Sequence, residues 1–481
     1  MHDHRDLAGL QARSLRLQEW IRKQTYSPEN EKVLRRFSEW EAAEFILRVS
    51  PEALRAALEA DPALPRGRAA DGGEAPAKAG PFGGQRWFSF EEIEALRAAL
   101  KPEGRDLRPA RPSSKRAVRA AVANFKGGAG KSTVALHYAH AAALDGYRVL
   151  LVDCDPQATL SHAMGLTETA EDATVWGIMA RDLARETRRM NAAPAAAASG
   201  LKPPERKIPE AIAEMGLETR DPADFIRPTA WPAIDMIPSC ANAAFVEFAT
   251  AQYRHLNPDW AFFAALSRYL DGLTDDAFDL ILFDCPPAIG YQSMNAVFAA
   301  DALIIPTGPG YWEYDSTTSF IGQLSEALED LAAGQDSFET GRVPLPKQFA
   351  ALKVLLTRYE PGNALHEAMR GAFQQVFRDR LCEHAVEHTR AVEQSGRFLC
   401  SVYEMDYRDM TRETWKRARR SFDRAWAEFH GVMLEAWEAI EATPERFPAG
   451  KGLLGQEGSG ASTPQKTSDS ETLQTSPEDA A

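Results

Sequence analysis

One stretch decides the expected fold of this chain, Val122-Ala123-Asn124-Phe125-Lys126-Gly127-Gly128-Ala129-Gly130-Lys131-Ser132-Thr133. An apolar run from Val118 leads into it and an apolar-periodic run from Val134 to Leu144 follows it. This pattern predicts a strand, a glycine-rich turn and a helix. Glycines let backbone N–H groups surround an anion without a Cβ clash, and a helix N-terminus adds partial positive charge. We therefore expect the turn to hold phosphates.

The spacing of this turn fits the phosphate-binding loop of nucleotide-binding proteins, with Lys126 where the first glycine usually stands. Lys131 is then expected to reach the β- and γ-phosphates of a nucleotide. The Ser132 hydroxyl is expected to bind Mg²⁺. Guanine nucleotides are disfavoured, because the chain has no Asn-Lys-x-Asp motif to recognise the base.

Two further apolar runs end in acidic residues. The run Val149–Val152 is followed by Asp153 and Asp155, and another ends at Asp284. The carboxyl ends of parallel strands share one edge of a sheet, where ligands bind. Asp284 matches the strand-end acid that holds Mg²⁺ in phosphate-loop proteins. Strand and helix patterns alternate over residues 118–360, which predicts a doubly wound, mostly parallel α/β sheet.

Composition limits the class of protein. The chain has 481 residues, 44% of them hydrophobic, and a net charge of −14, which predicts two or three soluble domains and argues against a uniformly basic nucleic-acid binder. No apolar run is long enough for a membrane helix, and the N-terminus lacks an apolar secretory core. The five cysteines have no CxxC spacing, so we expect a reduced, cytoplasmic protein without a zinc site or disulfide framework.

The sequence of residues 1–104 predicts two helical segments. Residues 1–34 have the pattern of one amphipathic helix, for which a packing role and a dimerisation role both remain open. Residues 35–104 contain Ser-based helix starts in the order of a winged helix-turn-helix module. A plain helical hairpin is the alternative. Arg55 is the basic residue on the outward face of the second predicted helix, and Arg48 stands where such turns often have glycine.

Three other segments have a distinct composition. Residues 105–118 are predicted to be a basic linker, either in contact with phosphates or merely a solvated tether. Residues 406–424 form a basic helical pattern, which suits either a DNA-backbone surface or a solvated helix face with intrahelical ion pairs. Residues 119–446 are predicted to form the nucleotide-binding domain, and residues 447–481 a disordered tail.

Three motifs give a resemblance to a known family. The segment Lys126–Thr133 resembles the deviant Walker A motif of the ParA/MinD ATPases, and the segments Leu151–Gln157 and Asp284–Pro287 are similar to the ParA branch. The N-terminal module looks like that of large ParA proteins. The segment Gln394–Glu404 and the helix after it resemble the RepA partition ATPases of repABC-type plasmids. The resemblance covers roughly 118–430.

The resemblance implies a weak, partner-stimulated ATPase with ATP and Mg²⁺ as cofactors. Two subunits would sandwich two ATP molecules, and Lys126 would cross to the partner's nucleotide. Asp155 would orient the attacking water, while Asp153 and Asp284 would lie in or near the outer shell of a Mg²⁺ bound by Ser132. Lys131 would complete the catalytic set with Lys126 and Asp155. The implied nucleotide-binding residues are Gly127, Gly128, Ala129, Gly130, Lys131, Ser132 and Thr133.

The same resemblance implies a homodimer that binds nucleoid DNA without sequence preference and is stimulated by a ParB-like centromere-binding partner to segregate plasmid copies. Autoregulation of its own operon is also implied, and a mainly nucleotide-switched transcriptional repressor is the alternative function. A MinD-like membrane protein is disfavoured by the polar C-terminal tail, and a nitrogenase-iron-protein relative by the cysteine pattern. The predicted DNA contacts are Arg55, Arg408, Lys416, Arg417, Arg419 and Arg420.

Overall fold

The structure is a computed structural model. It describes residues 13–14, 16–17, 32–69, 73, 85–104, 106–107, 116–192, 206–241, 245–273, 277–334 and 345–441. Most of the predicted helix over residues 1–34 lies outside these ranges, as do most of the predicted linker and the whole of the predicted tail. Within the predicted helix, residues 13–14 and 16–17 are helical, whereas residues 32–34 are not.

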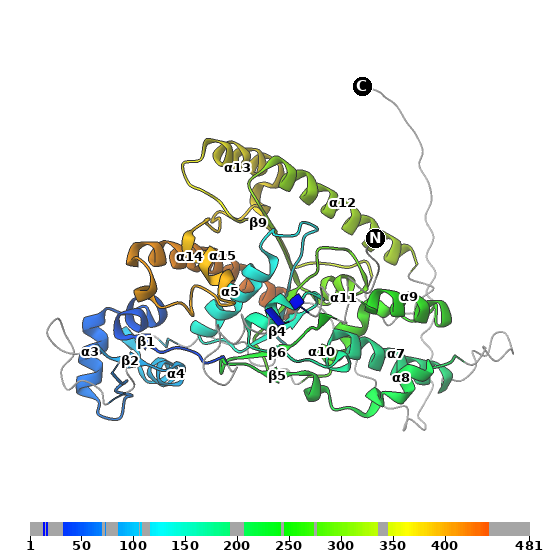
Figure 1. Cartoon of the computed structure of the whole chain (residues 1–481), viewed down its shortest axis with the longest axis horizontal. Helices are drawn as coiled ribbons and strands as arrows, with labels where there is room; N and C mark the ends of the chain where they lie inside the picture. The colour runs from blue at the N-terminus through cyan, green and yellow to red at the C-terminus, as the bar shows by residue number, and fades with distance from the viewer. Residues whose placement is uncertain are drawn as a thin grey trace, which may run out of the picture. The chain divides into compact units, whose positions relative to one another are not determined.

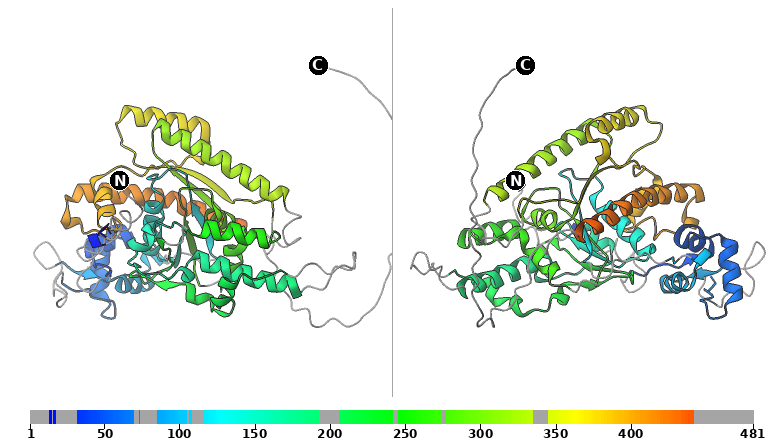
Figure 2. Two further views of the ribbon diagram at one scale, coloured as in Figure 1. Left: turned by 45° about the vertical axis from the view of Figure 1, so that its right-hand side comes forward. Right: turned by 180° about the vertical axis from the view of Figure 1, so that it is seen from behind.

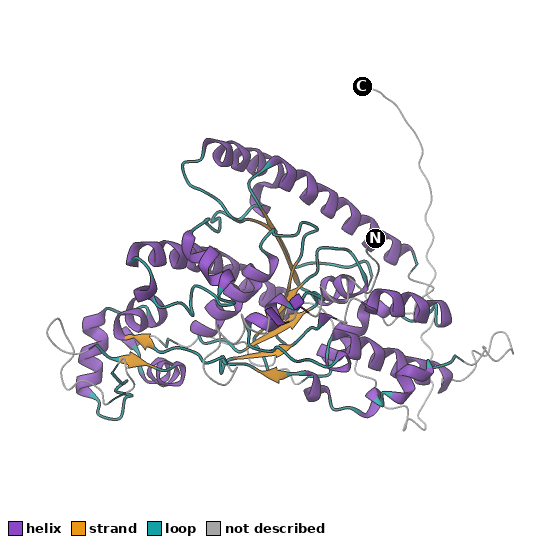
Figure 3. Cartoon of the chain, in the orientation of Figure 1, coloured by secondary structure: helices purple, strands orange, loops and turns teal. Residues whose placement is uncertain are grey.

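A seven-stranded sheet lies at the centre of the chain (Figures 1 and 3). Its strand order is β5-β6-β4-β7-β3-β8-β9, and every neighbouring pair is parallel except β5 with β6. The predicted mostly parallel α/β sheet is therefore confirmed. The strands are β3 (Val118–Val122), β4 (Val149–Asp153), β5 (Arg227–Pro228), β6 (Ile234–Ile237), β7 (Leu280–Asp284), β8 (Ala302–Thr307) and β9 (Ala351–Leu356).

Helices cover both faces of this sheet (Figures 1 and 2). Successive strand residues alternate between two apolar clusters, as β3 illustrates with Ala120 in one cluster and Ala121 in the other. The first cluster contains residues of α5 (Lys131–Leu144) and α15 (Arg412–Glu441). The second contains residues of α7 (Val175–Ala192), α10 (Ala265–Asp271), α11 (Tyr291–Ala299) and α12 (Tyr311–Ala333). This is the doubly wound arrangement, in which apolar strands are buried on both faces.

The shorter helices connect these layers or lie at their margins. The residues 406–411 before α15 form a 3-10 turn (Tyr407–Asp409) and loop rather than helix, because the Asp406 carboxylate caps that turn. The remaining α-helices described outside the N-terminal module are α6 (Thr159–Ala163), α8 (Glu210–Glu214), α9 (Val246–Leu256), α13 (Ala364–Phe377) and α14 (Arg390–Arg397).

The N-terminal module contains a pair of helices joined by a tight turn, a short two-stranded sheet and a further helix, α4 (Phe90–Ala99). Two of the Ser-based helix starts expected in residues 35–104 form capping boxes, at Ser38 and at Ser89. Between the two helices Arg48 adopts φ 55 and ψ 44, the left-handed conformation that glycine usually supplies at such a turn. The residues of the predicted wing lie mostly outside the described ranges. The elements are β1 (Phe37–Ser38), α2 (Glu39–Glu41), a π-helix (Ala42–Leu47), α3 (Pro51–Ala60), β2 (Trp87–Phe88) and α4 (Phe90–Ala99).

This module shares its hydrophobic core with the sheet domain. Residues of both belong to one apolar cluster, and both lie within one compact unit. Trp231, fully buried in the loop before β6, contacts the rings of Phe37 and Phe90 from the module. The same indole stacks on His140 of α5 with ring centroids 4.2 Å apart. The phosphate-loop helix is thus connected to the module through direct packing.

Two buried histidines on α5 should make the protein sensitive to acid. Burial lowers the pKa of His137 to about 4 and that of His140 to about 3, from an ordinary value of 6.5. The unfolded chain therefore binds more protons than the folded protein below pH 6.5, and stability falls as the pH drops from 6.5 toward 4. Each histidine should cost about 1.4 kcal/mol per pH unit in that interval.

Urea unfolding at pH 7 and pH 5.5 measures this effect. We expect a lower free energy of unfolding at pH 5.5, and a smaller difference between the two pH values in His140→Gln. His255 is exposed, so His255→Gln should show the same difference as the unsubstituted protein. Equal differences in all three proteins would contradict the assignment.

Candidate nucleotide site

The predicted turn forms between β3 and α5. Gly128 has φ 75 and Gly130 has φ 92, values that side chains other than glycine rarely adopt. Cβ atoms added at Gly127 and Gly128 would meet nothing within 4 Å, whereas one at Gly130 would lie 3.4 Å from Thr357 Cγ2. The turn is therefore open on one side, where an anion can approach its backbone, and closely packed on the other.

Polar residues at neighbouring strand ends hold this turn in place. The Thr357 hydroxyl donates to the Ala129 carbonyl at 2.8 Å. The Asn124 amide donates to the Pro306 carbonyl at 2.8 Å and to the Thr317 hydroxyl at 3.0 Å. The sequence analysis missed these residues. Thr357 directly follows an apolar strand, and that position was the one available signal for it.

Lys131 begins α5 and is almost completely buried. Its Nζ donates to the Lys126 carbonyl oxygen at 3.2 Å. Burial lowers the pKa of Lys131, and the charges of Asp284 and Asp155 oppose that change. A buried ammonium group with few hydrogen bonds gains most from an anionic partner such as a phosphate.

The strand-end acids Asp153 and Asp284 face each other across β4 and β7, where they are register partners. Burial raises the pKa of Asp284 well above its ordinary value, the nearby charge of Asp153 adds to the rise, and the Ser132 side chain opposes it. Neither Asp284 carboxylate oxygen has a hydrogen-bond partner of normal geometry among the described residues. A buried carboxylate without partners beside a serine hydroxyl fits a Mg²⁺ site.

Asp153 differs from Asp284, because its carboxylate is fully hydrogen-bonded. One oxygen accepts from the Asp155 backbone N–H at 3.0 Å, and the other from the Ser161 backbone N–H at 2.9 Å and its hydroxyl at 2.7 Å. Asp153 therefore fixes the loop that carries Asp155. The Asp155 carboxylate in turn accepts from the Gln157 backbone N–H at 2.9 Å.

Among the described residues, no group of three or more His, Cys, Asp or Glu side chains could hold a metal ion without other ligands. Mg²⁺ commonly uses one or two protein oxygens together with substrate phosphates. Ser132 and Asp284 are the residues that would hold it here. Thr133 follows on the first turn of α5 and is half-buried.

Lys126 points to a partner in its own chain. Its Nζ lies 2.9 Å from Glu313 Oε1 on the first turn of α12. Arg358 Nη2 lies 3.6 Å from the same oxygen. The structure thus brings Lys131, Ser132, Asp153, Asp155 and Asp284 to one edge of the sheet, while the side chain of Lys126 is held by a carboxylate that the sequence analysis did not identify.

The comparisons with known proteins agree with this geometry. Residues 118–333 match a family model described as an AAA domain. "Putative replication protein A" of Sinorhizobium fredii is 28% identical over 86% of this chain and 90% of its own length. Protein SopA of Escherichia coli is 26% identical, with 86% and 92% covered. The chain is also similar to the chromosome partitioning protein ParA of Caulobacter vibrioides, with 25% identity over 58% of this chain and 83% of that protein. A solved structure titled "Partition Protein" has the same fold, with 19% identity, a TM-score of 0.53 and coverage of 89% and 99%.

The predicted DNA contacts mostly have partners within the protein. Four of these cations form ion pairs: Arg55 with Glu39, Arg408 with Asp406, Arg417 with Glu387, and Arg420 with Glu44 at 3.8 Å. Two lie over aromatic rings: Arg408 over Trp87 and Lys416 over Trp40. Arg417 and Arg420 remain exposed. Surface ion pairs are weak, so these cations can exchange an internal partner for a phosphate.

The prediction that Arg419 contacts DNA is wrong for this structure. The residue is 1% exposed. Its guanidinium lies over the rings of Phe45, Tyr403 and Trp415 at 4.9 to 5.5 Å. Its position on α15, one residue before the exposed Arg420, turns it toward the N-terminal module, and a side chain buried in that interface cannot reach a phosphate.

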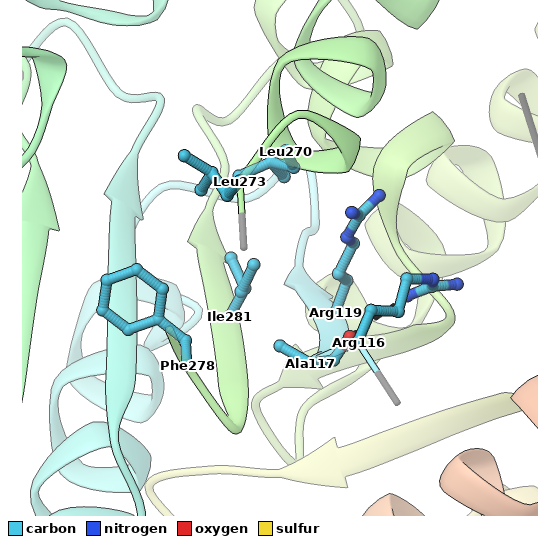
Figure 4. Close-up of a pocket in the computed structure, with 7 residues that line it drawn as sticks. All are labelled: Arg116, Ala117, Arg119, Leu270, Leu273, Phe278 and Ile281. Carbon is cyan, nitrogen blue, oxygen red and sulfur yellow. Dashed lines mark hydrogen bonds between the residues drawn. The ribbon is translucent and has the colours of Figure 1, made fainter. Parts of the chain in front are cut away.

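A small pocket lies at the opposite edge of the sheet (Figure 4). Arg116 and Arg119 line it from the beginning of β3, and Phe278 and Ile281 from the beginning of β7. Arg116 is bound by Asp301 and Arg119 by Asp271. Because these residues lie at the amino ends of β3 and β7, the pocket is separate from the candidate nucleotide site at the carboxyl ends of the same strands. No helix among the described residues has the length and hydrophobicity needed to cross a membrane.

Proposed function

We propose that this protein is an ATPase that partitions plasmid copies. The observation that carries the proposal is the site at the carboxyl ends of β3, β4 and β7, where an open glycine turn, the buried Lys131 and the unpartnered Asp284 meet. These groups suit the phosphates and the Mg²⁺ of ATP. The similarity to a protein named as the chromosome partitioning protein ParA supports a role in partition.

The proposed reaction is hydrolysis of ATP between two subunits. Bound Mg²⁺ neutralises charge on the phosphates. The backbone N–H groups of the loop, Lys131 and Thr133 bind the phosphates, and Asp155 orients the attacking water. Lys126 of each subunit reaches the nucleotide of the other and stabilises the charge that develops on the γ-phosphoryl oxygens.

Closure of the dimer on ATP creates a surface that binds nucleoid DNA without sequence preference, with Arg417 and Arg420 of α15 among its contacts. A ParB-like centromere-binding partner stimulates hydrolysis and thereby releases DNA. The protein acts in the cytoplasm on the nucleoid.

DNA binding across nucleotide states and salt concentrations tests this function. We expect the complex with a non-hydrolysable ATP analogue to bind duplex DNA of any sequence, and the ADP form and the free protein to bind weakly. Phosphate contacts release counterions, so the logarithm of the affinity should fall linearly with the logarithm of the salt concentration. Lys131→Ala is the matched control and should remove the nucleotide dependence. Binding that is equal in all nucleotide states would contradict the proposal.

A second candidate function is repression of the protein's own operon. The observation that favours it is the turn between the two N-terminal helices, where Arg48 takes the left-handed conformation typical of a helix-turn-helix. The module also packs on α5 through Trp231 and His140. Nucleotide binding at the start of α5 can therefore act on the module through direct contacts.

A further inference from the structure

The carboxylate that binds Lys126 occupies a space shaped for it. A Cβ atom on Gly310 would collide with Glu313 Oε2, and one on Gly308 would lie 2.8 Å from Glu313 Cγ. Both glycines precede α12. Any larger residue at either position would displace the Glu313 side chain. The loop between β8 and α12 is thus compatible with Glu313 in this position because it lacks side chains there.

Glu313 has two cations within reach, and they come from different elements. Lys126 belongs to the phosphate loop and lies at 2.9 Å. Arg358 follows β9, has a φ of 54 and lies at 3.6 Å. Burial raises the pKa of Glu313, but the hydrogen bond and charge of Lys126 and the charge of Arg358 together hold it below its ordinary value. The carboxylate is therefore ionised at neutral pH and keeps a counter-ion if Lys126 leaves.

Both lysines of the loop are held within the chain. The side chain of Lys126 is bound by Glu313, and its carbonyl oxygen accepts from Lys131 Nζ at 3.2 Å. A Lys126 side chain paired in this way cannot also serve the nucleotide of a second subunit. Its transfer requires the loss of one ion pair and the gain of another.

We propose that Glu313 is a positioning residue for Lys126, which it binds within the subunit and releases to the second subunit's nucleotide while Arg358 keeps Glu313 neutralised. This role rests on the proposed function, because the proposed function supplies the second subunit's nucleotide to which Lys126 is released. Glu313 thereby sets the ATP concentration at which the dimer closes.

Two substitutions should shift that concentration in opposite directions. Glu313→Gln keeps the shape and removes the charge, so Lys126 is released more easily, and the concentration of a non-hydrolysable ATP analogue that gives half dimer should fall about two- to fivefold, the value of a modest ion pair. In Arg358→Gln, Lys126 is the one remaining cation of the two within reach of Glu313, so its release leaves the carboxylate without a counter-ion. This variant should therefore raise the concentration that gives half dimer. Light scattering after size-exclusion chromatography measures the dimer.

Two controls test whether the effect of Glu313→Gln depends on its ion pair with Lys126. Glu326→Gln removes an exposed carboxylate from the same helix and should leave the concentration unchanged. In a Lys126→Gln background, Glu313→Gln should have no further effect, because the partner is already gone. An equal effect of Glu313→Gln in both backgrounds would overturn the proposal, since it would show that Glu313 acts through something other than Lys126.

A measurement on the monomer separates this inference from the proposed function. Acylation of lysines by an amine reagent without nucleotide, followed by mass spectrometry, should modify Lys126 faster in Glu313→Gln than in the unsubstituted protein. An unchanged rate of Lys126 acylation would show that Glu313 does not bind Lys126 and would overturn the proposal. Faster acylation with an unchanged dimerisation threshold would overturn the positioning role. If the unsubstituted protein forms no dimer with ATP, the proposed function fails and the release step fails with it, while the acylation rate still reports the pair.

Discussion

Replacing Lys126 by glutamine should abolish the stimulation of ATP hydrolysis by DNA and the ParB-like partner while leaving ATP binding intact. In the proposed reaction, phosphate binding within the subunit relies on the open glycine turn and on Lys131, which begins α5. The Lys126 side chain lies instead against Glu313. Its proposed place in the reaction is the nucleotide of the second subunit, so glutamine removes only that cation.

The expected loss is large because a cation that acts in the transition state cannot be replaced by water. Removing one such electrostatic contact typically costs about 10²- to 10³-fold in turnover, so the stimulated rate should fall to the unstimulated rate. Turnover with partner and DNA, together with the dissociation constant of a fluorescent ATP analogue, measures both effects. Lys131→Ala is the contrasting variant and should weaken nucleotide binding itself. A Lys126→Gln protein that retains full stimulated turnover would reject the two-subunit site.

Replacing Trp231 by alanine should lower the free energy of unfolding by about 3–5 kcal/mol, the usual cost of removing a large aromatic side chain from a core. Trp231 is 0% exposed and lies between the N-terminal module and α5. Its indole Nε1 also donates to Glu404 at 3.1 Å. Truncation leaves a cavity among these rings and deprives the buried Glu404 carboxylate of a donor.

Trp312→Ala is the matched control for this prediction. Trp312 is 72% exposed at the start of α12, so its removal should change the free energy of unfolding by less than about 0.5 kcal/mol. Urea unfolding of the two variants and the unsubstituted protein gives the comparison. Similar small changes in both variants would contradict the role of Trp231 as the contact between the module and α5.

The local sequence was sufficient for the sheet and for most of the nucleotide site. Apolar runs that end in Asp153 and Asp284, with the glycine turn before α5, predict parallel strands whose carboxyl ends meet. In the structure, the register of β4 with β7 places the two acids side by side. The capping boxes at Ser38 and Ser89 formed for the same reason, because each depends on residues three positions apart.

Contacts between distant segments were not predictable from the sequence. The pattern of α15 shows a basic helix, but it cannot tell that Arg419 is buried by rings from the module, since that depends on how two segments pack.

By itself the sequence determined the glycine-rich turn, the order of the strand-end acids and the parallel sheet, because local spacing and the alternation of strand and helix patterns indicate them. The tertiary structure alone decided that Thr357 supports the turn, that Asp153 holds the Asp155 loop while Asp284 is left open, and that Glu313 binds Lys126. The Glu313 and Lys126 side chains are 187 residues apart along the chain. Only the folding of β3 beside β8 brings them within reach of each other.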